Sequence, residues 1–292
     1  MQEQTKFGRF HDKYYKHLLI IPIVILLFSC FYLYNFNKTQ GDIIHKDISL
    51  KGGTSVTISD KINIPDLKLK LSDSLEELQV REIYDLITRE QKAVVIETTS
   101  QGEQVKKILE DYLGYTLDEE NSSFEFSDSS FTSKFYTQLL WANIIAFILM
   151  SLVVFIIYRS FVPSFTVISC VLIDVIMTLV AIDIIGIKLS TAGIIAFLML
   201  IGYSVDTDIL LTTRLMKREG DLNEKIYGSF KTGITMTLTS LLAVIAALFI
   251  VKSFSEILTQ IFLIISIGLT FDILNTWLTN VSILKWYLKE KK

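Results

Sequence analysis

The chain has 292 residues, of which 51% are hydrophobic, and its mean hydropathy of +0.46 exceeds that of a typical soluble domain. Its 28 basic and 31 acidic residues nearly balance, so the charge gives no indication of a nucleic-acid partner. The apolar residues come in long blocks, which is the pattern that bilayer spans require, and we therefore expect a polytopic α-helical membrane protein.

Six apolar blocks are long enough to cross a bilayer, because a helix of about 20 residues spans its hydrocarbon core. They cover residues 18–36, 139–158, 165–187, 191–212, 233–251 and 257–284. The first block lacks the small-residue cleavage site of a signal peptide, so we predict that it is transmembrane helix 1, with helices 2–6 in residues 139–284. Cys30 and Cys170 fall inside these blocks, which favours buried packing over a disulfide or a metal site.

The basic residues gather on one side of the predicted bundle. The N-terminal tail 1–17, the connection after the fourth block and the C-terminal tail 285–292 are rich in Lys and Arg, whereas the two short opposite loops carry only Lys188 and Lys252. By the positive-inside rule, both termini then lie in the cytoplasm and residues 37–138 lie outside it. We predict a multi-pass protein of the cell (plasma) membrane.

The segment 37–138 is predicted to form an acidic extracytoplasmic α+β domain, with 12 basic and 19 acidic residues. Alternation predicts a strand over 48–59 with a bend at Gly52-Gly53. Pro65, near the start of residues 65–75, is consistent with a helix over that segment. Strands over 80–88 and 93–98, a helix over 102–113 and a strand over 122–127 follow. The order β-α-β-β-α-β predicts a ferredoxin-like arrangement between transmembrane helices 1 and 2.

Carboxylates inside the spans are the most informative feature. Asp174 lies in the third span, Asp206 and Asp208 in the fourth, and Asp272 in the sixth. A charge at the bilayer centre costs about 3 kcal/mol on insertion scales, so these groups are expected to face protein or water and to be functional. Asp183, near the outer end of the third span, is expected to reach water and to have no special role.

Asp206 and Asp208 are two residues apart, so on a regular helix they point about 200° apart and cannot share one site. One is expected to face the bundle and the other to lie near the cytoplasmic surface. Asp206 precedes Arg214 by eight residues, or about 12 Å, which predicts a buried position close to the cytoplasmic side. A functional role for Asp206 is favoured over that of a hydrogen-bonded packing residue.

The fifth and sixth spans also carry polar residues. Hydroxyl groups in the fifth span could form interhelical hydrogen bonds or line a proton path, and both interpretations stay open. They belong to Thr232, Thr235, Thr237, Thr239 and Ser240. Lys231 either pairs with a carboxylate across the bundle or is an ordinary cytoplasmic lysine. Asp272 begins a polar stripe at helical spacing that is expected to face other helices, and such buried carboxylates suit proton binding.

The order of the predicted elements is one span, a large external domain and five further spans. This layout resembles that of the SecF members of the SecD/SecF family of protein-export membrane proteins, in their archaeal form. That family belongs to the resistance-nodulation-division superfamily. Three segments carry the resemblance: Ser49-Leu50-Lys51-Gly52-Gly53-Thr54, Gly202-Tyr203-Ser204-Val205-Asp206-Thr207-Asp208, and Gly268 with residues 272–280.

The resemblance implies an accessory subunit of the Sec machinery that promotes translocation of secreted proteins with the proton gradient. The implied partners are SecD in a heterodimer, a SecY-type channel, unfolded secretory polypeptides and membrane lipid, with no cofactor and no enzymatic activity. The chain has no Walker-type glycine loop, which fits a machine that does not itself hydrolyse ATP.

The proton-relay candidates under this resemblance are Asp206, Asp208, Asp272, Asp174 and Lys231. Bacterial members carry an Asn-Asp pair after the Gly-Tyr-Ser turn, and the two acids here flank the position of that aspartate, so either could take its role. Lys231 stands in the place of a bacterial arginine and keeps its charge without the forked donor geometry.

Three alternatives stay open. A small-molecule exporter of the same superfamily would share the fold. An intramembrane aspartyl protease would need Asp206 and Asp272 within hydrogen-bond reach, although the chain lacks a Gly-x-Gly-Asp pattern. A purely structural assembly subunit would use its aspartates for packing alone.

Overall fold

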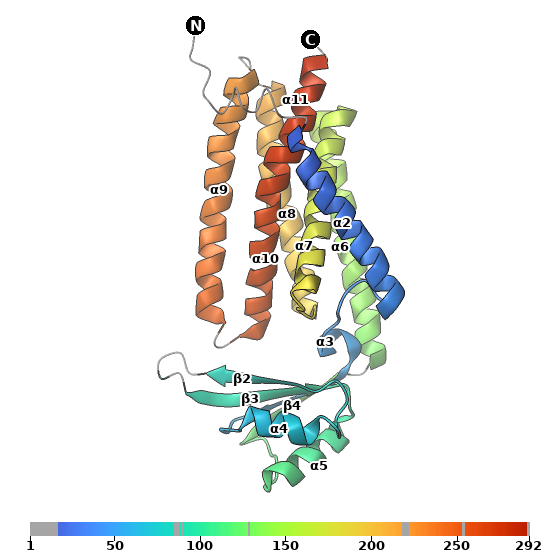
Figure 1. Ribbon diagram of the computed structural model, residues 1–292, viewed down its shortest axis with the longest axis vertical. Coiled ribbons are helices and arrows are strands. Elements are labelled where there is room, and N and C mark those ends of the chain that lie inside the picture. The colour runs from blue at the N-terminus through green and yellow to red at the C-terminus, as the bar shows by residue number, and fades with distance from the viewer. Residues whose placement is uncertain are drawn as a thin grey trace.

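The computed structural model describes residues 17–84, 88, 90–127, 129–217, 222–252 and 255–290. It consists of a helical bundle with a small sheet domain at one end (Figure 1). Six helices in the described ranges are long and apolar enough to cross a membrane, which confirms the predicted number. They cover Ile20–Thr39, Lys134–Tyr158, Phe161–Ile184, Thr191–Met216, Leu222–Val251 and Ile257–Glu290. Most of the predicted N-terminal tail lies outside the described residues.

The bundle has a buried centre and an exposed periphery. Its helices are α2 (Ile20–Gln40), α6 (Ser129–Tyr158), α7 (Phe161–Ile184), α8 (Thr191–Lys217) and α9 (Leu222–Val251), followed by a last span in three parts. That span comprises α10 (Glu256–Asn275), the π-helical segment η1 (Thr276–Asn280) and α11 (Val281–Glu290). The helices α7, α8 and α10 are the most buried, and α2 begins and α11 ends at the end of the bundle away from the sheet (Figure 1).

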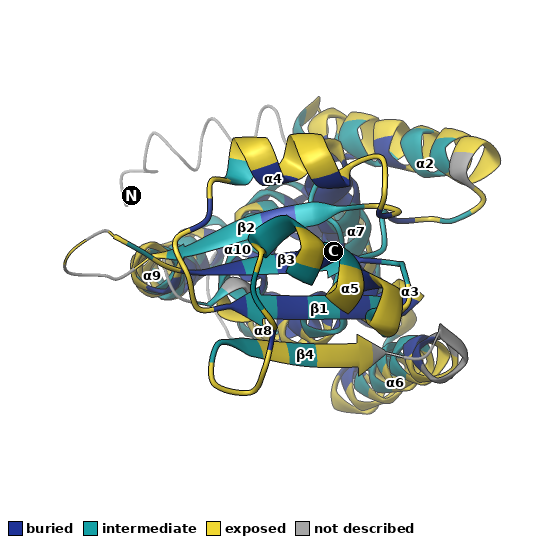
Figure 2. Ribbon diagram, turned by 90° about the horizontal axis from the view of Figure 1, so that it is seen from below, coloured by how far each residue is buried: buried dark blue, intermediate teal, exposed yellow. Residues whose placement is uncertain are grey.

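The sheet domain lies between α2 and α6 in the chain. Its elements are α3 (Ile48–Lys51), β1 (Gly53–Ile58), α4 (Ile64–Leu71), β2 (Gln79–Tyr84), β3 (Gln91–Thr98), α5 (Gly102–Leu113) and β4 (Ser122–Ser127). The strand order is β2-β3-β1-β4 and all neighbours are antiparallel, with Val56 opposite Ile96 and Phe124. Figure 2 shows α4 and α5 on the sheet face that points away from the bundle.

Alternation along the strands builds the domain core, because successive side chains of a strand point to opposite faces. Val56 and Ile58 of β1 and Ile96 of β3 are fully buried against Leu67 of α4 and Leu109 of α5. Local signals end the helices. The Asn63 side chain caps α4, whose first turn contains a proline, and Gly114 closes α5 in the left-handed conformation.

The predicted strand over 48–59 is wrong in its first part. Ile48–Lys51 forms one helical turn, and the strand begins only at Gly53. Both glycines have positive φ, 87° at Gly52 and 149° at Gly53, so the chain changes direction there. A Cβ on Gly53 would lie 2.3 Å from the Thr98 carbonyl oxygen, so only glycine fits this approach to β3.

Two further expectations are only partly met. Cys170 is buried in the bundle, but Cys30 is exposed on the surface of α2. The predicted strand over 80–88 is β2 as far as Tyr84, and residues 85–87 lie outside the described residues.

Candidate functional site

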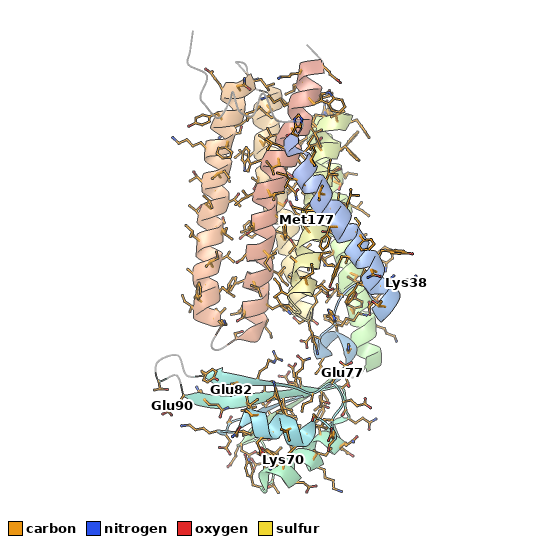
Figure 3. The ribbon with its side chains drawn as sticks, in the orientation of Figure 1. Lys38, Lys70, Glu77, Glu82, Glu90 and Met177 are labelled. Carbon is orange, nitrogen blue, oxygen red and sulfur yellow. The ribbon has the colours of Figure 1, made fainter. Side chains whose placement is uncertain are left out.

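Three carboxylates from three helices lie at the centre of the bundle. Asp174 of α7, Asp208 of α8 and Asp272 of α10 each have 0% exposed surface. On α8, Ser204 and Asp208 are one turn apart and share the face that packs inward, where both are fully buried. The sequence therefore folds each acid onto the buried side of a central helix. Figure 3 places Met177, one turn after Asp174, inside the bundle, whereas the labelled charged residues lie outside the bundle core.

Asp174 accepts hydrogen bonds from two neutral side chains. The Ser204 hydroxyl lies 2.6 Å from Oδ2, and the Asn275 amide nitrogen lies 2.5 Å from Oδ1. The same amide lies 3.6 Å from the Met177 sulfur. These contacts join α7 to α8 and to the end of α10.

Asp208 and Asp272 are linked through the last span. The Thr276 hydroxyl lies 3.0 Å from Asp208 Oδ1 and 3.3 Å from Asp272 Oδ1, and the Asn280 amide nitrogen donates to Asp208 Oδ1 at 2.7 Å. Among the described residues, the Oδ2 atoms of Asp208 and Asp272 are buried and have no hydrogen-bond partner. These two oxygens are open to accept a proton or a water molecule.

The π-helical segment shapes this site. Among the described residues, the two hydrogen-bond donors to Asp208 are Thr276 and Asn280, and both belong to η1, where the helix is wider than a regular α-helix. Short π segments inside α-helices are rare and are frequent at functional sites. The sequence analysis predicted a polar stripe that faces other helices, and all of Asp272, Asn275, Thr276 and Asn280 are indeed fully buried.

Two relay candidates lie elsewhere. The prediction that Asp206 is buried is wrong, because the packed face of α8 carries Asp208 and a residue two positions earlier points to the opposite side, where it is exposed. Asp206 lies six residues, or about 9 Å along α8, before Thr212, the last residue of the predicted fourth span. Lys231 is also exposed, and it forms no ion pair within the part of the chain that the structure describes.

Three of the hydroxyl groups predicted in the fifth span form hydrogen bonds with groups other than the carboxylates. Thr235 and Thr239 are exposed and donate to carbonyl groups of their own helix, at 2.7 and 2.8 Å. Thr232 accepts a hydrogen bond from Arg214 at 2.9 Å near the end of α8. These three hydroxyls are therefore not part of the carboxylate cluster, whereas Thr237 is buried and its hydroxyl has no hydrogen-bond partner among the described residues.

Asp183 is a buried carboxylate whose contacts could not be recognised from the sequence. This residue lies in the last turn of α7 with only 3% exposed surface, so the prediction that it reaches water is wrong. Its carboxylate accepts hydrogen bonds from the Tyr32 hydroxyl at 3.0 Å and the His45 backbone at 3.1 Å, and it lies 2.6 Å from His45 Nδ1. The segment that leads into the sheet domain covers it, and no local pattern in the sequence indicates such a long-range contact.

The three resemblance segments occupy different places. Ser49-Leu50-Lys51-Gly52-Gly53-Thr54 forms α3 and the start of β1, next to the bundle. Gly202 and Tyr203 are exposed on α8, and Ser204 is part of the carboxylate cluster. A Cβ on Gly268 of α10 would lie 2.4 Å from a Leu200 methyl group, so a glycine here allows α8 and α10 to approach closely.

Comparisons with known proteins agree with one another. The family model described as protein export membrane protein SecD/SecF, C-terminal, matches residues 104–290. The protein-export membrane protein SecF of Methanolacinia petrolearia is 34% identical over 94% of this chain and 94% of its own length. That of Methanocaldococcus jannaschii is 37% identical over 95% of this chain and 97% of its own length.

A solved structure shares the fold. The crystal structure of SecDF, a translocon-associated membrane protein from Thermus thermophilus, has a TM-score of 0.73 and 16% identity. The similarity covers 99% of this chain but only 39% of that longer chain. Because the family model covers more than half of the chain and the SecF relatives match nearly all of it, this chain belongs to the SecD/SecF family of protein-export membrane proteins.

Proposed function

We propose that this protein is an accessory, non-enzymatic subunit of the Sec export machinery, and that protonation of its buried carboxylates helps to drive translocation of secreted proteins. The observation that carries the proposal is the cluster of Asp174, Asp208 and Asp272, each fully buried in the centre of the bundle. Family membership supplies the export role, and the cluster supplies a place where a proton gradient can act on this chain.

The chemistry of the cluster supports proton exchange. The described hydrogen-bond donors to the three carboxylates are neutral hydroxyl and amide groups. Burial of several like charges in a low-dielectric interior disfavours full ionisation, so a cluster of this kind is suited to exchange protons. Gain or loss of one proton changes the hydrogen bonds between α7, α8 and α10, and with them the packing of the three central helices.

The exposed position of Asp206 within a predicted span supports the proposal of a partner protein in the membrane. An exposed carboxylate within a span is unfavourable against lipid, by about 3 kcal/mol at the bilayer centre and less towards its surface, and a neighbouring protein can remove that cost. We propose that helices of SecD cover this face in a heterodimer, and that the pair acts beside a SecY-type channel on unfolded secretory polypeptides.

The proposed topology follows the charge distribution. We propose that residues 1–17 and 285–292 are cytoplasmic tails, that 18–36 and 139–284 lie in the plasma membrane, and that 37–138 form a ferredoxin-like domain outside it. The β-α-β-β-α-β order and the strand order β2-β3-β1-β4 support that domain assignment.

The test is an export assay in cells depleted of the native protein. These cells carry wild type, Asp208→Asn, Asp272→Asn, Asp206→Asn or the double variant of positions 206 and 208, with membrane levels and SecD co-purification measured in each. We expect Asp208→Asn and Asp272→Asn to abolish export while the complex remains intact, and Asp206→Asn to weaken co-purification first. Normal export in the double variant would contradict the proton-linked role and leave a scaffold as the better account.

An intramembrane aspartyl protease is the second candidate, and one observation favours it. Asp208 and Asp272 come from two helices and share the Thr276 hydroxyl, as members of a catalytic pair could. Both are fully buried, however, whereas a protease needs a carboxyl pair that a peptide and water can reach. Cleavage of a membrane-embedded peptide by the purified chain, lost in Asp272→Asn, would favour this alternative.

A further inference from the structure

The sheet domain is joined to the bundle at both of its ends: β4 is closely followed in the chain by α6, and a short segment that we call the stem, residues 42–51, leads from α2 through α3 to β1. Two of its apolar side chains, Ile44 and Leu50, are buried at 6% and 3% exposure. They belong to the same apolar cluster as Leu189 of the α7–α8 turn and Ile264 of α10. The stem is therefore part of the outer end of the bundle core.

Backbone hydrogen bonds fix the stem to the turn between α7 and α8. Lys46 and Leu189 form a parallel β-bridge. The Leu189 N–H donates to the His45 carbonyl at 2.7 Å, and the Asp47 N–H donates to the Leu189 carbonyl at 3.0 Å. At the first residue of α8, the Thr191 N–H donates to the Ser49 hydroxyl at 3.3 Å. These bonds hold the stem to two central helices at once.

Asp183 adds a connection from the end of α7. Its Oδ1 accepts the His45 N–H and lies 2.6 Å from His45 Nδ1, while Oδ2 accepts the Tyr32 hydroxyl of α2. Asp174 of the carboxylate cluster lies nine residues earlier on the same helix, about 14 Å away along its axis. A shift of α7 therefore acts on the stem through Asp183.

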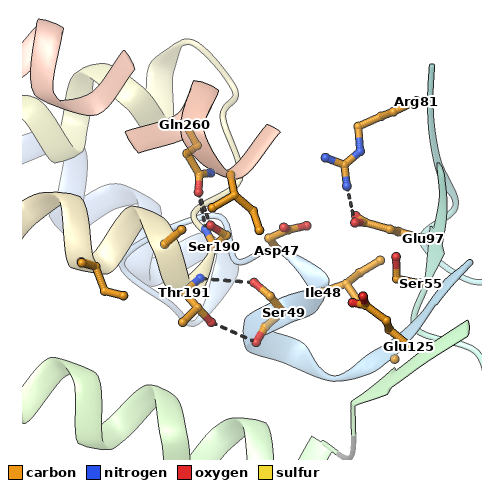
Figure 4. Close-up of a pocket in the computed structure, with 14 residues that line it drawn as sticks. Asp47, Ile48, Ser49, Ser55, Arg81, Glu97, Glu125, Ser190, Thr191 and Gln260 are labelled. Atoms are coloured by element: carbon orange, nitrogen blue, oxygen red, sulfur yellow. Dashed lines mark hydrogen bonds and ion pairs between the residues drawn. The ribbon is translucent and has the colours of Figure 1, made fainter. Parts of the chain in front are cut away.

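Gln260 makes the corresponding connection from α10. Its amide nitrogen donates to the Lys188 carbonyl at 2.6 Å, and its amide oxygen accepts hydrogen bonds from the backbone and the hydroxyl of Ser190 (Figure 4). Asp272 lies twelve residues later on α10, about 18 Å away. Two helices of the carboxylate cluster thus reach the same turn.

A cleft beside this joint leaves room for movement. It measures about 320 Å³ and lies between the polar sheet face and the outer ends of α8 and α10 (Figure 4). Ser55, Glu97 and Glu125 line it on the sheet side, and Thr191 and Gln260 line it on the bundle side. A rotation of the sheet domain about the stem would change the width of this cleft.

We propose that Asp183 and Gln260 are positioning residues that transmit rearrangements of α7 and α10, made when the carboxylate cluster gains or loses a proton, to the sheet domain through the stem. This inference rests on the proposed proton-linked function. In this proposal, Asp183 and Gln260 act through the stem and are not part of the proton path or of the surface that contacts exported chains. Their role is to make the sheet domain follow the central helices.

The test measures distances between spin labels in the full chain, reconstituted with its partner in lipid vesicles. Both native cysteines are replaced, and labels are attached at exposed Lys107 of α5 and exposed Lys252 at the end of α9. A second pair, at Ile185 and Lys252, reports movement within the bundle. Asp208→Asn with Asp272→Asn mimics the protonated cluster, so no change of pH is needed.

We expect both label pairs to differ between the parent and the Asp208→Asn, Asp272→Asn variant. Adding Asp183→Asn and Gln260→Leu, singly or together, should remove the difference between Lys107 and Lys252 while the pair within the bundle still responds. Lys61→Met is the matched control, because it breaks the Lys61–Glu90 ion pair, which lies wholly within the sheet domain.

Each outcome decides the matter. If the Lys107–Lys252 distance still changes in the Asp183→Asn and Gln260→Leu variants, the inference is overturned and the proposed function stays intact. The same holds if Lys61→Met removes that distance change to the same extent. If neither label distance changes in the Asp208→Asn, Asp272→Asn variant and that variant exports normally, both the inference and the proposed function are overturned. Loss of the response in the joint variants alone supports the inference.

Discussion

Replacement of Thr276 by valine tests the link between the two carboxylates on α8 and α10. The Thr276 hydroxyl is fully buried, 3.0 Å from Asp208 Oδ1 and 3.3 Å from Asp272 Oδ1. Valine has nearly the same shape, so Thr276→Val leaves no cavity and removes only the hydrogen-bond donor. Asp208 then keeps a single described donor, the Asn280 amide at 2.7 Å.

The expected loss of stability depends on whether the acceptor of the Thr276 hydroxyl is charged or neutral. A hydrogen bond to a charged group contributes about 1.5–3 kcal/mol, and about 1 kcal/mol when the acceptor is neutral. Thr276→Val should therefore destabilise the protein by about 1–3 kcal/mol. The matched control is Thr270→Val on the same span, where the exposed side chain donates only to the Ser266 carbonyl of its own helix at 2.8 Å. A surface change of that kind stays within about 0.5 kcal/mol.

The assay compares thermal unfolding of the two purified variants in the same detergent, together with export in depleted cells. We expect Thr276→Val to unfold at a clearly lower temperature than Thr270→Val and to export less at equal membrane level. Equal unfolding temperatures of the two variants would refute the view that the Thr276 hydroxyl links the two carboxylates. They would also remove the main evidence that Asp208 and Asp272 act together.

Three further predictions concern packing and pH. Gly268→Ala should destabilise the bundle by about 1–3 kcal/mol in thermal unfolding, because its Cβ would lie 2.4 Å from a Leu200 methyl group. Leu109→Ala should cost the sheet domain about 2–5 kcal/mol, seen as faster hydrogen exchange in α5, because the side chain is fully buried. Burial and the bond to Asp60 raise the pKa of Tyr115 to about 12 from 10.0, so its stabilising contribution is complete below pH 10 and is lost as the pH rises towards 12. Unfolding of the full chain between pH 9 and 12 should show this loss, and the Tyr115→Phe variant should lack it.

Short-range patterns made the element order predictable. Hydropathy blocks of about 20 residues require helices in lipid whatever their neighbours, and six such helices are present. In the sheet domain, the predicted helix over 102–113 and strand over 122–127 coincide with α5 and β4, because an amphipathic stripe and a strict alternation each exclude the other element. The glycine pair at 52–53 indicated a bend, but only the contact of Gly53 with the Thr98 carbonyl shows why the strand begins there.

The site was only partly predictable, because it depends on how the helices rotate against one another. Hydropathy places Asp206 and Asp208 in one span but does not say which faces α7 and α10. The η1 segment, which brings Thr276 and Asn280 to Asp208, depends on packing over the whole bundle. Asp183 is buried only because the stem, far away in the sequence, folds over it.

The spacing of Asp206 and Asp208 links the proposed proton exchange in the bundle to the proposed partner in the membrane. Two residues on a helix are about 200° apart, so a buried carboxylate on α8 leaves the other one on the outer face. Asp208 is fully buried among hydroxyl and amide donors, and Asp206 is exposed at a depth where lipid would surround it. A covering partner would lower the cost of that exposed charge, and it would also pack directly against the helix that carries Asp208. Movements of α8 that follow protonation would then reach the partner as well as the sheet domain.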